Sequence, residues 1–232
     1  MFFIFQLIIL IYIIIVIYYI IELKKYNIYG KIISMDELND DLQLNNHLKN
    51  LNPLHTNFHN YNHLSFGYLM KINPFQKKDS CHSMEDFIKD FNEQDQNYFF
   101  KQTITNVNLK KEMSIIINHL FDSQYFFPIQ YSLSLFQGKT IIPLQKCNHN
   151  YNIIGHIEGD STIYLFNPKH KDDIIYKDNS KIKKWGQKIT MKKNDILFIP
   201  NNWYYIQEIN NTCIQFHIDI DTYFSFIPNF FK

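Results

Sequence analysis

The feature that most constrains this chain is an apolar run at its start. Between Met1 and Ile21 no charged side chain occurs, and Gln6 is the single amide. A helix of this length is about 30 Å long, which matches the hydrocarbon core of a bilayer. The run therefore predicts a transmembrane anchor over residues 1–22. A buried core helix is the alternative, but such helices seldom stay apolar over so many residues.

The flanks of the run predict its orientation. A cleaved signal peptide would carry basic residues before a shorter apolar core and a small-residue cleavage site before Gly30, and the sequence has neither. Lys24, Lys25 and Lys31 follow the run, and no basic residue precedes it. The positive-inside rule therefore predicts a single-pass membrane protein whose C-terminal domain is cytoplasmic, with Met1–Ile21 contacting the membrane.

Charge and composition exclude several classes of function. The 22 acidic residues nearly balance the 23 basic ones, and every one of the latter is lysine, so no global field attracts nucleic acid. Chemistry that depends on an arginine clamp is also excluded. Alanine is absent as well, while Ile, Asn and Lys abound, which is the bias of an A+T-rich genome. The three cysteines, Cys81, Cys147 and Cys213, are far apart and predict reduced thiols.

Residues 23–125 are expected to form a linker and a helical N-terminal region. Ser34 and Glu37 have the spacing of a capping box that opens a short helix, and Ser83 can cap a second one. The clearest helix begins at Leu109 and continues to Phe121, because its apolar residues recur at helical spacing. Between the first two helices we expect a loop over residues 51–63 and a strand over residues 64–70.

Residues 126–232 have the pattern of short β-strands. Runs of Ile, Tyr, Phe and Thr alternate with Gly, Pro and Asn, and a lysine-rich insert over residues 168–186 separates the fourth run from the fifth. Eight short strands in a row predict a mainly β fold, a sandwich or a jelly roll. The expected strands cover residues 129–136, 139–144, 152–157, 161–166, 187–191, 195–199, 203–209 and 212–218.

Two of these stretches resemble a known family. The segment from Asn152 to Pro168 (NIIGHIEGDSTIYLFNP) is similar to the pattern NxxxQxxGxKxxxLFxP, and that from Lys193 to Tyr205 (KNDILFIPNNWYY) is similar to PGDxxxIPxGWxH. Both patterns belong to the cupin-like, JmjC-type oxygenases that use iron and 2-oxoglutarate, in particular their asparaginyl-hydroxylase-like members. The resemblance implies a double-stranded β-helix, a jelly roll of cupin type, with a pocket inside.

The sequence departs from this family where iron and 2-oxoglutarate would bind. The resemblance implies a His-x-Asp/Glu pair and a distal His as iron ligands. Tyr205 stands at the distal position, and the first pair falls on Lys146 and Asn148 or, with one insertion, on Gln145 and Cys147. The lysine that would bind 2-oxoglutarate is Ser161. We therefore expect no catalytic residue, metal or cofactor, and a vestigial pocket at Gln145, Cys147, Ser161, Trp203 and Tyr205.

Histidines offer other metal sites. His156 and Glu158 spell an H-x-E pair, with His149 or His217 as possible partners. Strand alternation, however, places His156 on the face opposite to Ser161, unless a bulge at Gly159 changes the parity. His55, His59 and His63 would bind zinc only on a helix, which Pro53 and the Asn-rich context disfavour.

The lysines around Trp185 could form a basic surface for anionic lipid. Asp172, Asp173 and Asp178 dilute their charge and favour an ordinary solvated face.

Three functions remain open at this point. The first is a membrane-anchored pseudoenzyme, a non-catalytic binding or scaffold module that binds a protein partner or a small ligand in the β-helix pocket, without nucleic acid. The second is an active protein hydroxylase that binds Fe(II) and 2-oxoglutarate at an atypical site. The third is a structural membrane protein of a large DNA virus, whose interior would be filled by aromatic side chains.

Overall fold

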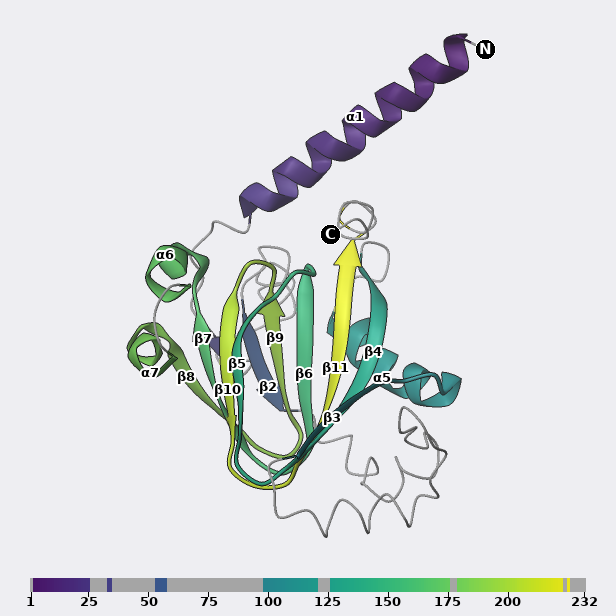
Figure 1. Ribbon diagram of the computed structural model, residues 1–232. Helices are drawn as coiled ribbons and strands as arrows, with labels where there is room; N and C mark the ends of the chain where they lie inside the picture. The colour runs from purple at the N-terminus through teal and green to yellow at the C-terminus, as the bar shows by residue number, and fades with distance from the viewer. Residues whose placement is uncertain are drawn as a thin grey trace.

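A computed structural model describes residues 2–25, 33–34, 53–57, 98–120, 126–175, 179–222 and Ser225 (Figure 1). The predicted helices that begin at Ser34 and Ser83, the predicted strand over residues 64–70, and His59, His63 and Cys81 lie outside the described residues, apart from Ser34, which ends a two-residue strand.

The described part of the domain consists of two β-sheets. The larger has seven strands in the order β1-β2-β9-β6-β11-β4-β3 and is antiparallel except for the pair β1 and β2. Its strands are β1 (Ile33–Ser34), β2 (Leu54–Asn57), β3 (Tyr98–Thr103), β4 (Phe126–Gln137), β6 (Tyr151–Glu158), β9 (Asp195–Pro200) and β11 (Cys213–Thr222).

The smaller sheet is antiparallel and has the order β5-β10-β7-β8. Its strands are β5 (Thr140–Lys146), β7 (Ser161–Phe166), β8 (Gln187–Met191) and β10 (Tyr204–Ile209). Side chains between the two sheets form the core.

The strand order fits an eight-stranded jelly roll. Counted from β4, the first, third, sixth and eighth strands form the centre of the larger sheet, and the second, fourth, fifth and seventh form the smaller one. Successive strands therefore alternate between the sheets, except β7 and β8, which are neighbours in one sheet. The predicted mainly β jelly roll is confirmed, and each of the eight predicted strands overlaps an observed one.

Helix α5 (Val107–Leu120) confirms the helix expected from Leu109. The Asn106 side chain caps it, because its Oδ1 accepts hydrogen bonds from the backbone N–H groups of Asn108 at 2.9 Å and Leu109 at 3.1 Å. Leu109 and Met113, one turn apart, are fully buried. Leu109 and Met113 therefore lie on a face of α5 that is turned away from solvent.

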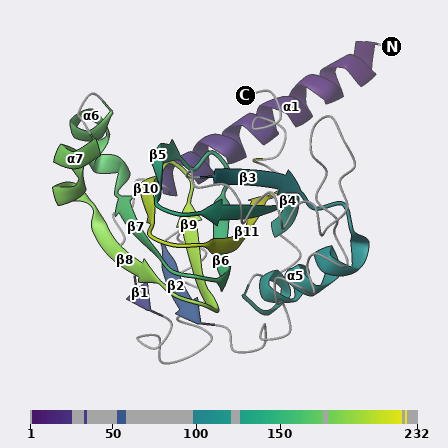
Figure 2. The same ribbon diagram turned by 60° about the horizontal axis from the view of Figure 1, so that its bottom comes forward.

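The lysine-rich insert between β7 and β8 is folded into short helical segments. These are η3 (Pro168–His170), α6 (Lys171–Ile174), α7 (Asn179–Ile182) and η4 (Lys183–Trp185). They lie at one end of the molecule and α5 at the other (Figures 1 and 2). Ile174 and Ile182 are buried against Phe166 and Ile206, which fixes the insert on the small sheet.

Helix α1 (Phe2–Lys25) extends beyond the β-domain (Figure 1). The structure describes its side chains from Ile4 to Tyr18 and that of Ile21, and large apolar ones such as Ile8 are exposed. Among the described residues, no helix meets the combined demand of length and apolarity for crossing a membrane. The transmembrane anchor stays a prediction.

One short strand contradicts a prediction made from the sequence. Residues 51–63 were expected to be a loop, but Leu54–Asn57 forms β2, which pairs with β9. Leu54 and Thr56 are buried, while His55 and Asn57, which alternate with them along the strand, both contact Asp195. The strand has too few residues to show an alternating pattern and forms because β9 offers it an open edge.

Candidate functional site

The interior near the end of β5 is the first candidate site, because the vestigial pocket was expected there. Cys147 follows β5 and Trp203 precedes β10. The Cys147 N–H donates to the Trp203 carbonyl at 2.9 Å, and the Asn202 N–H donates to the Cys147 carbonyl at 2.9 Å. Asn202 has a φ of 65°, which an Asn tolerates well in a tight turn. The structure thus brings Cys147 and Trp203 together, and Tyr205 packs against them.

These three side chains belong to an apolar cluster between the sheets. Cys147 is 3% exposed and Trp203 2% exposed, while Tyr205 is partly buried. The cluster draws residues from strands of both sheets, so it occupies the space in which a β-helix could hold a ligand. Its other members are Ile154, Ile163, Leu165, Ile189, Met191, Leu197 and Ile199.

Two polar groups of this cluster, the Cys147 thiol and the Tyr205 phenol, are poorly suited to bind iron. The Cys147 thiol contacts the carbonyl oxygens of Ile199 at 3.2 Å and His149 at 3.4 Å. Burial, reinforced by the negative charge of Asp219, raises the pKa of Cys147 far above its usual range. Burial does the same to the pKa of the Tyr205 phenol. Neither group is an imidazole or a carboxylate, which are the ligands of the iron site that the resemblance implies. The residues present do not fit the metal.

The other two pocket positions lie elsewhere. Gln145 pairs in register with Tyr205 across β5 and β10, but its side chain is exposed. Ser161, at the start of β7, is buried and hydrogen-bonded to a second group of interior residues. The structure therefore gathers Cys147, Trp203 and Tyr205 at one place, leaves the side chain of the adjacent Gln145 exposed, and places Ser161 in a different polar cluster.

This second group is a polar cluster around His156. The His156 Nε2 lies 3.0 Å from the Ser161 Oγ and 2.9 Å from the Gln215 Nε2, and the Gln207 side chain donates to the Ser161 Oγ at 2.9 Å. All four residues are buried. Burial lowers the pKa of His156 to about 4, so the imidazole is neutral at pH 7 and can accept a hydrogen bond.

The contact between His156 and Ser161 corrects the prediction that they lie on opposite faces. Strand alternation holds within one strand, but β6 and β7 belong to different sheets. The chain turns between them at Gly159, whose φ is 79°, and both side chains then point into the space between the sheets. Glu158 is exposed, so the H-x-E spelling is not a ligand pair.

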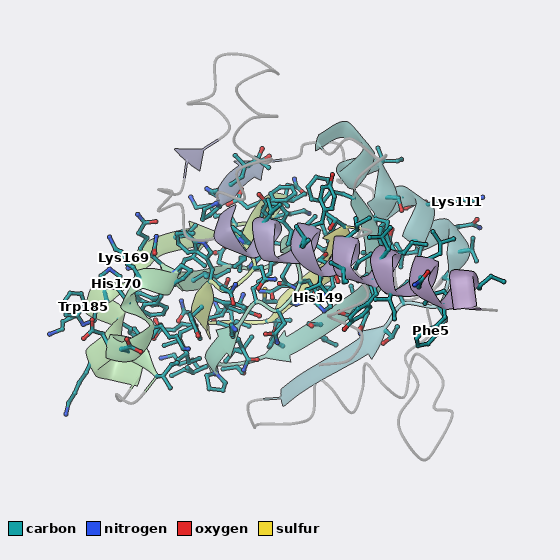
Figure 3. The ribbon with its side chains drawn as sticks, turned by 90° about the horizontal axis from the view of Figure 1, so that it is seen from above. Phe5, Lys111, His149, Lys169, His170 and Trp185 are labelled. Atoms are coloured by element: carbon teal, nitrogen blue, oxygen red, sulfur yellow. The ribbon has the colours of Figure 1, made fainter. Side chains whose placement is uncertain are left out.

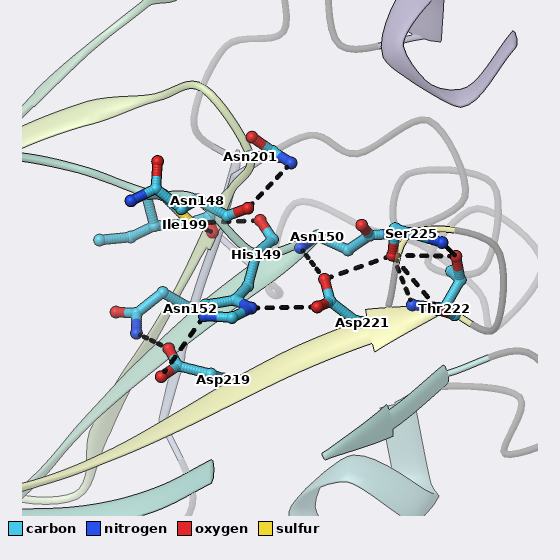
Figure 4. A network of polar contacts seen from close by, with 11 residues as sticks. Asn148, His149, Asn150, Asn152, Ile199, Asn201, Asp219, Asp221, Thr222 and Ser225 are labelled. Carbon is cyan, nitrogen blue, oxygen red and sulfur yellow. Dashed lines mark hydrogen bonds and ion pairs between the residues drawn. The ribbon is translucent and has the colours of Figure 1, made fainter. Parts of the chain in front are cut away.

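A third group surrounds His149 at the start of β6 (Figure 4). The His149 Nδ1 is 3.0 Å from the Asp221 Oδ2, and its Nε2 is 4.0 Å from the Asp219 Oδ2. The Asn152 side chain donates to the other oxygen of Asp219 at 2.5 Å. His149 is 31% exposed, so this group reaches the surface.

Asp221 is the buried carboxylate of the His149 group and is held by several hydrogen bonds. It is fully buried, and its Oδ1 accepts from the Asn150 N–H at 3.0 Å and from the Ser225 hydroxyl at 3.3 Å. A buried carboxylate needs such partners, because desolvation otherwise disfavours its charge. The network ties the connection between β5 and β6 to the end of β11.

Sequence reasoning missed Asp219 and Asp221. They are separated from His149 by about 70 residues, and only the antiparallel pairing of β6 with β11 brings them close. The available signal was the alternation Asp-Ile-Asp directly after the strand predicted over residues 212–218, because continuation of that strand places both carboxylates on one face.

The remaining histidine prediction concerns His55. It lies on β2, not on a helix, and its Nε2 is 3.4 Å from the Asp195 Oδ2. Over the part of the chain that the structure describes, no three His, Cys, Asp or Glu residues are placed to hold a metal ion.

Comparisons with known proteins give only distant likenesses. No protein-family model and no curated protein matches the chain. Among solved structures, a cupin superfamily protein from Desulfitobacterium hafniense aligns with a TM-score of 0.35 and 11% identity over 64% of this chain and 97% of its own. The Cnp3 cupin domain of Schizosaccharomyces pombe aligns with a TM-score of 0.33 and 10% identity over 55% and 66%. The jelly-roll fold of this chain rests on its strand order.

Proposed function

We propose that this chain is a non-catalytic, cupin-like binding or scaffold domain of JmjC-like type, held at a membrane by Met1–Ile21. The observation that carries the proposal is the apolar cluster at Cys147, Trp203 and Tyr205. An oxygenase needs charged and imidazole ligands at this place, together with open coordination positions for its substrates. Apolar side chains supply neither.

The same cluster favours a partner on the outside of the domain. Aromatic and aliphatic groups from both sheets fill the interior near the end of β5, which leaves little room for a small ligand there. A scaffold binds through its surface, and a protein partner is the class that an exposed sheet edge or loop surface recognises best.

The membrane part of the proposal is supported by the apolar sequence from Met1 to Ile21 and by the exposure of its side chains. Ile4, Ile8 and Tyr12 are each about 60% exposed along α1. Apolar side chains in such numbers are costly in water and stable in lipid. Lys24 and Lys25 at the end of α1 would remain at the cytoplasmic interface.

Metal content tests the non-catalytic part. The full chain, purified in detergent, is incubated anaerobically with Fe(II) and 2-oxoglutarate, desalted and analysed by elemental mass spectrometry. The proposal expects iron at background level in the wild type and in the variants His149→Ala and His156→Ala. Near-stoichiometric iron that one of these substitutions removes would refute it and favour a hydroxylase with an atypical site.

Alkaline carbonate extraction tests the anchor. Each lysine at the centre of a transmembrane helix disfavours insertion by about 3 kcal/mol. The double variant Ile9→Lys/Ile13→Lys should therefore move from the membrane pellet to the supernatant, while the control Ile9→Leu/Ile13→Leu stays in the pellet. Wild-type protein in the supernatant would refute the anchor.

A further inference from the structure

The insert between β7 and β8 presents a basic face, which we define as the exposed side chains of residues 168–175 and 181–188. Within these ranges the sequence has six lysines and two aspartates. Lys183 forms an ion pair with Glu208 of β10, so its charge is locally compensated. The other lysines project from the short helical segments and the start of β8 and are exposed: Lys169, Lys171, Lys181, Lys184 and Lys188.

Trp185 lies in the middle of this face and is 40% exposed. Its ring is 5.4 Å from the His170 ring, and the Lys184 Nζ is 5.3 Å from its centroid. Figure 3 shows Lys169, His170 and Trp185 together at one end of the molecule. A large aromatic ring held at the surface among cations is the pattern of a side chain that enters the headgroup region of a bilayer.

The chemistry of the cations favours a broad anionic surface over a single phosphate group. Lysine is a flexible point charge, whereas a discrete phosphate site uses the planar fork of arginine or converging backbone N–H groups. The lysines here are spread over four short segments and β8. Such a distribution suits the diffuse negative potential of a leaflet that contains anionic lipid.

We propose that the basic face docks on the anionic leaflet of the membrane that anchors the chain, with Trp185 at headgroup depth. This inference rests on the proposed anchor, which would keep the domain near the bilayer. Figure 1 shows α6 of the insert on the side of the domain toward which the C-terminal end of α1 points. Because the anchor supplies a high local concentration, a few weak lysine contacts suffice to hold the domain down. In the sequence, the aspartates between these lysines favour an ordinary solvated face. The exposed Trp185 ring among the lysines favours membrane docking instead.

Trp185 itself can report the docking. The chain has two tryptophans, and the other, Trp203, is 2% exposed. The full-length Trp203→Phe variant is reconstituted into nanodiscs of phosphatidylcholine with brominated acyl chains, with and without 30% phosphatidylserine. The proposal expects bromine quenching of Trp185 fluorescence only with phosphatidylserine, and its loss in 0.5 M salt. Each lysine removed from the face should weaken docking about fivefold.

Two triple variants separate this surface from a general charge effect. Lys181→Glu/Lys184→Glu/Lys188→Glu should abolish the quenching while the protein stays incorporated. The matched control reverses three exposed lysines on other elements, namely Lys111→Glu, Lys139→Glu and Lys193→Glu, and should quench like the parent.

Three outcomes would overturn the docking surface. These are an incorporated protein without quenching, equal quenching in neutral and anionic nanodiscs, and an equal loss in both triple variants. Protein that does not enter nanodiscs at all refutes the anchor instead. Should Trp203→Phe fail to fold, the wild type replaces it, with Trp185→Phe as the variant that must lose the quenching.

Discussion

The neutral imidazole of His156 makes the stability of the domain depend on pH. Its pKa is about 4 in the folded chain, because burial disfavours the charged form, against 6.5 in an exposed histidine. The unfolded chain therefore binds a proton between these values that the folded chain does not. Stability is fully present above pH 6.5 and falls as the pH decreases toward 4. The difference between the two pKa values corresponds to about 3 kcal/mol in the free energy of unfolding. About 2 kcal/mol of this is lost between pH 7.5 and pH 5.0.

The neighbouring carboxylate Asp195 does not contribute to the change in stability over this pH range. Burial raises its pKa, but hydrogen bonds from His55, the Lys192 N–H and Asn57 outweigh burial and leave it below the ordinary value of 3.8. A carboxylate whose pKa is lowered stabilises the fold above that ordinary value and loses its contribution only at lower pH. Its effect is therefore constant between pH 7.5 and pH 5.0.

Urea unfolding at pH 7.5, 6.0 and 5.0, followed by the fluorescence of the buried Trp203, measures the effect. The His156→Gln variant keeps an amide that can bond Ser161 but cannot titrate. Its free energy of unfolding should fall by about 2 kcal/mol less than that of the wild type over the same range. The control His170→Gln removes a partly exposed imidazole and should follow the wild type. Parallel pH profiles of His156→Gln and wild type would refute the argument from desolvation.

Three further predictions concern the backbone and the core. Gly159→Ala should lower the free energy of unfolding by about 2 kcal/mol or more in urea titrations, because the residue has a φ of 79° and a Cβ would lie 2.2 Å from the Thr212 carbonyl oxygen; a change below 0.5 kcal/mol would contradict this. Trp203→Ala should cost about 3–5 kcal/mol through the cavity it leaves, measured in the same way, and a loss under 1 kcal/mol would show that the cluster is not tightly packed. Cys147 and Cys213, whose pKa values burial raises, should not react with a thiol reagent at pH 8 until urea unfolds the chain, and rapid labelling of either in the native state would disprove their burial.

The β-strands were predictable because their information is local. Residues 161–166 are rich in β-branched and aromatic side chains, residues 187–191 follow a glycine, and both strands have the predicted limits. The helix that begins at Leu109 was equally predictable, because its apolar residues recur at the spacing of an α-helix, and α5 covers them up to Leu120. In contrast, β2 has four residues and forms on the edge of β9, which no local pattern reveals.

The interior of the site could be predicted only in part. The resemblance implied a pocket that includes Cys147, Trp203 and Tyr205, and the structure places these three together, because β5 pairs with β10 and the Cys147 N–H donates to the Trp203 carbonyl. It could not place Ser161 relative to His156, since that depends on the crossing from one sheet to the other at Gly159. The contacts of His149 with the carboxylates of β11 depend likewise on pairing between distant strands.

The way the chain enters the larger sheet has a mechanical consequence. Ile33–Ser34 is a two-residue strand at the outer edge of that sheet, and it precedes every other described strand in the chain. A force applied through α1 therefore reaches the β-domain at its weakest pair, β1 with β2, before it reaches β9. Peeling so short a pair breaks its hydrogen bonds one after another, at low force, while the eight strands of the jelly roll remain unstrained. Under tension, β1 would therefore detach first and lengthen the connection between α1 and the jelly roll, while the jelly roll stays folded.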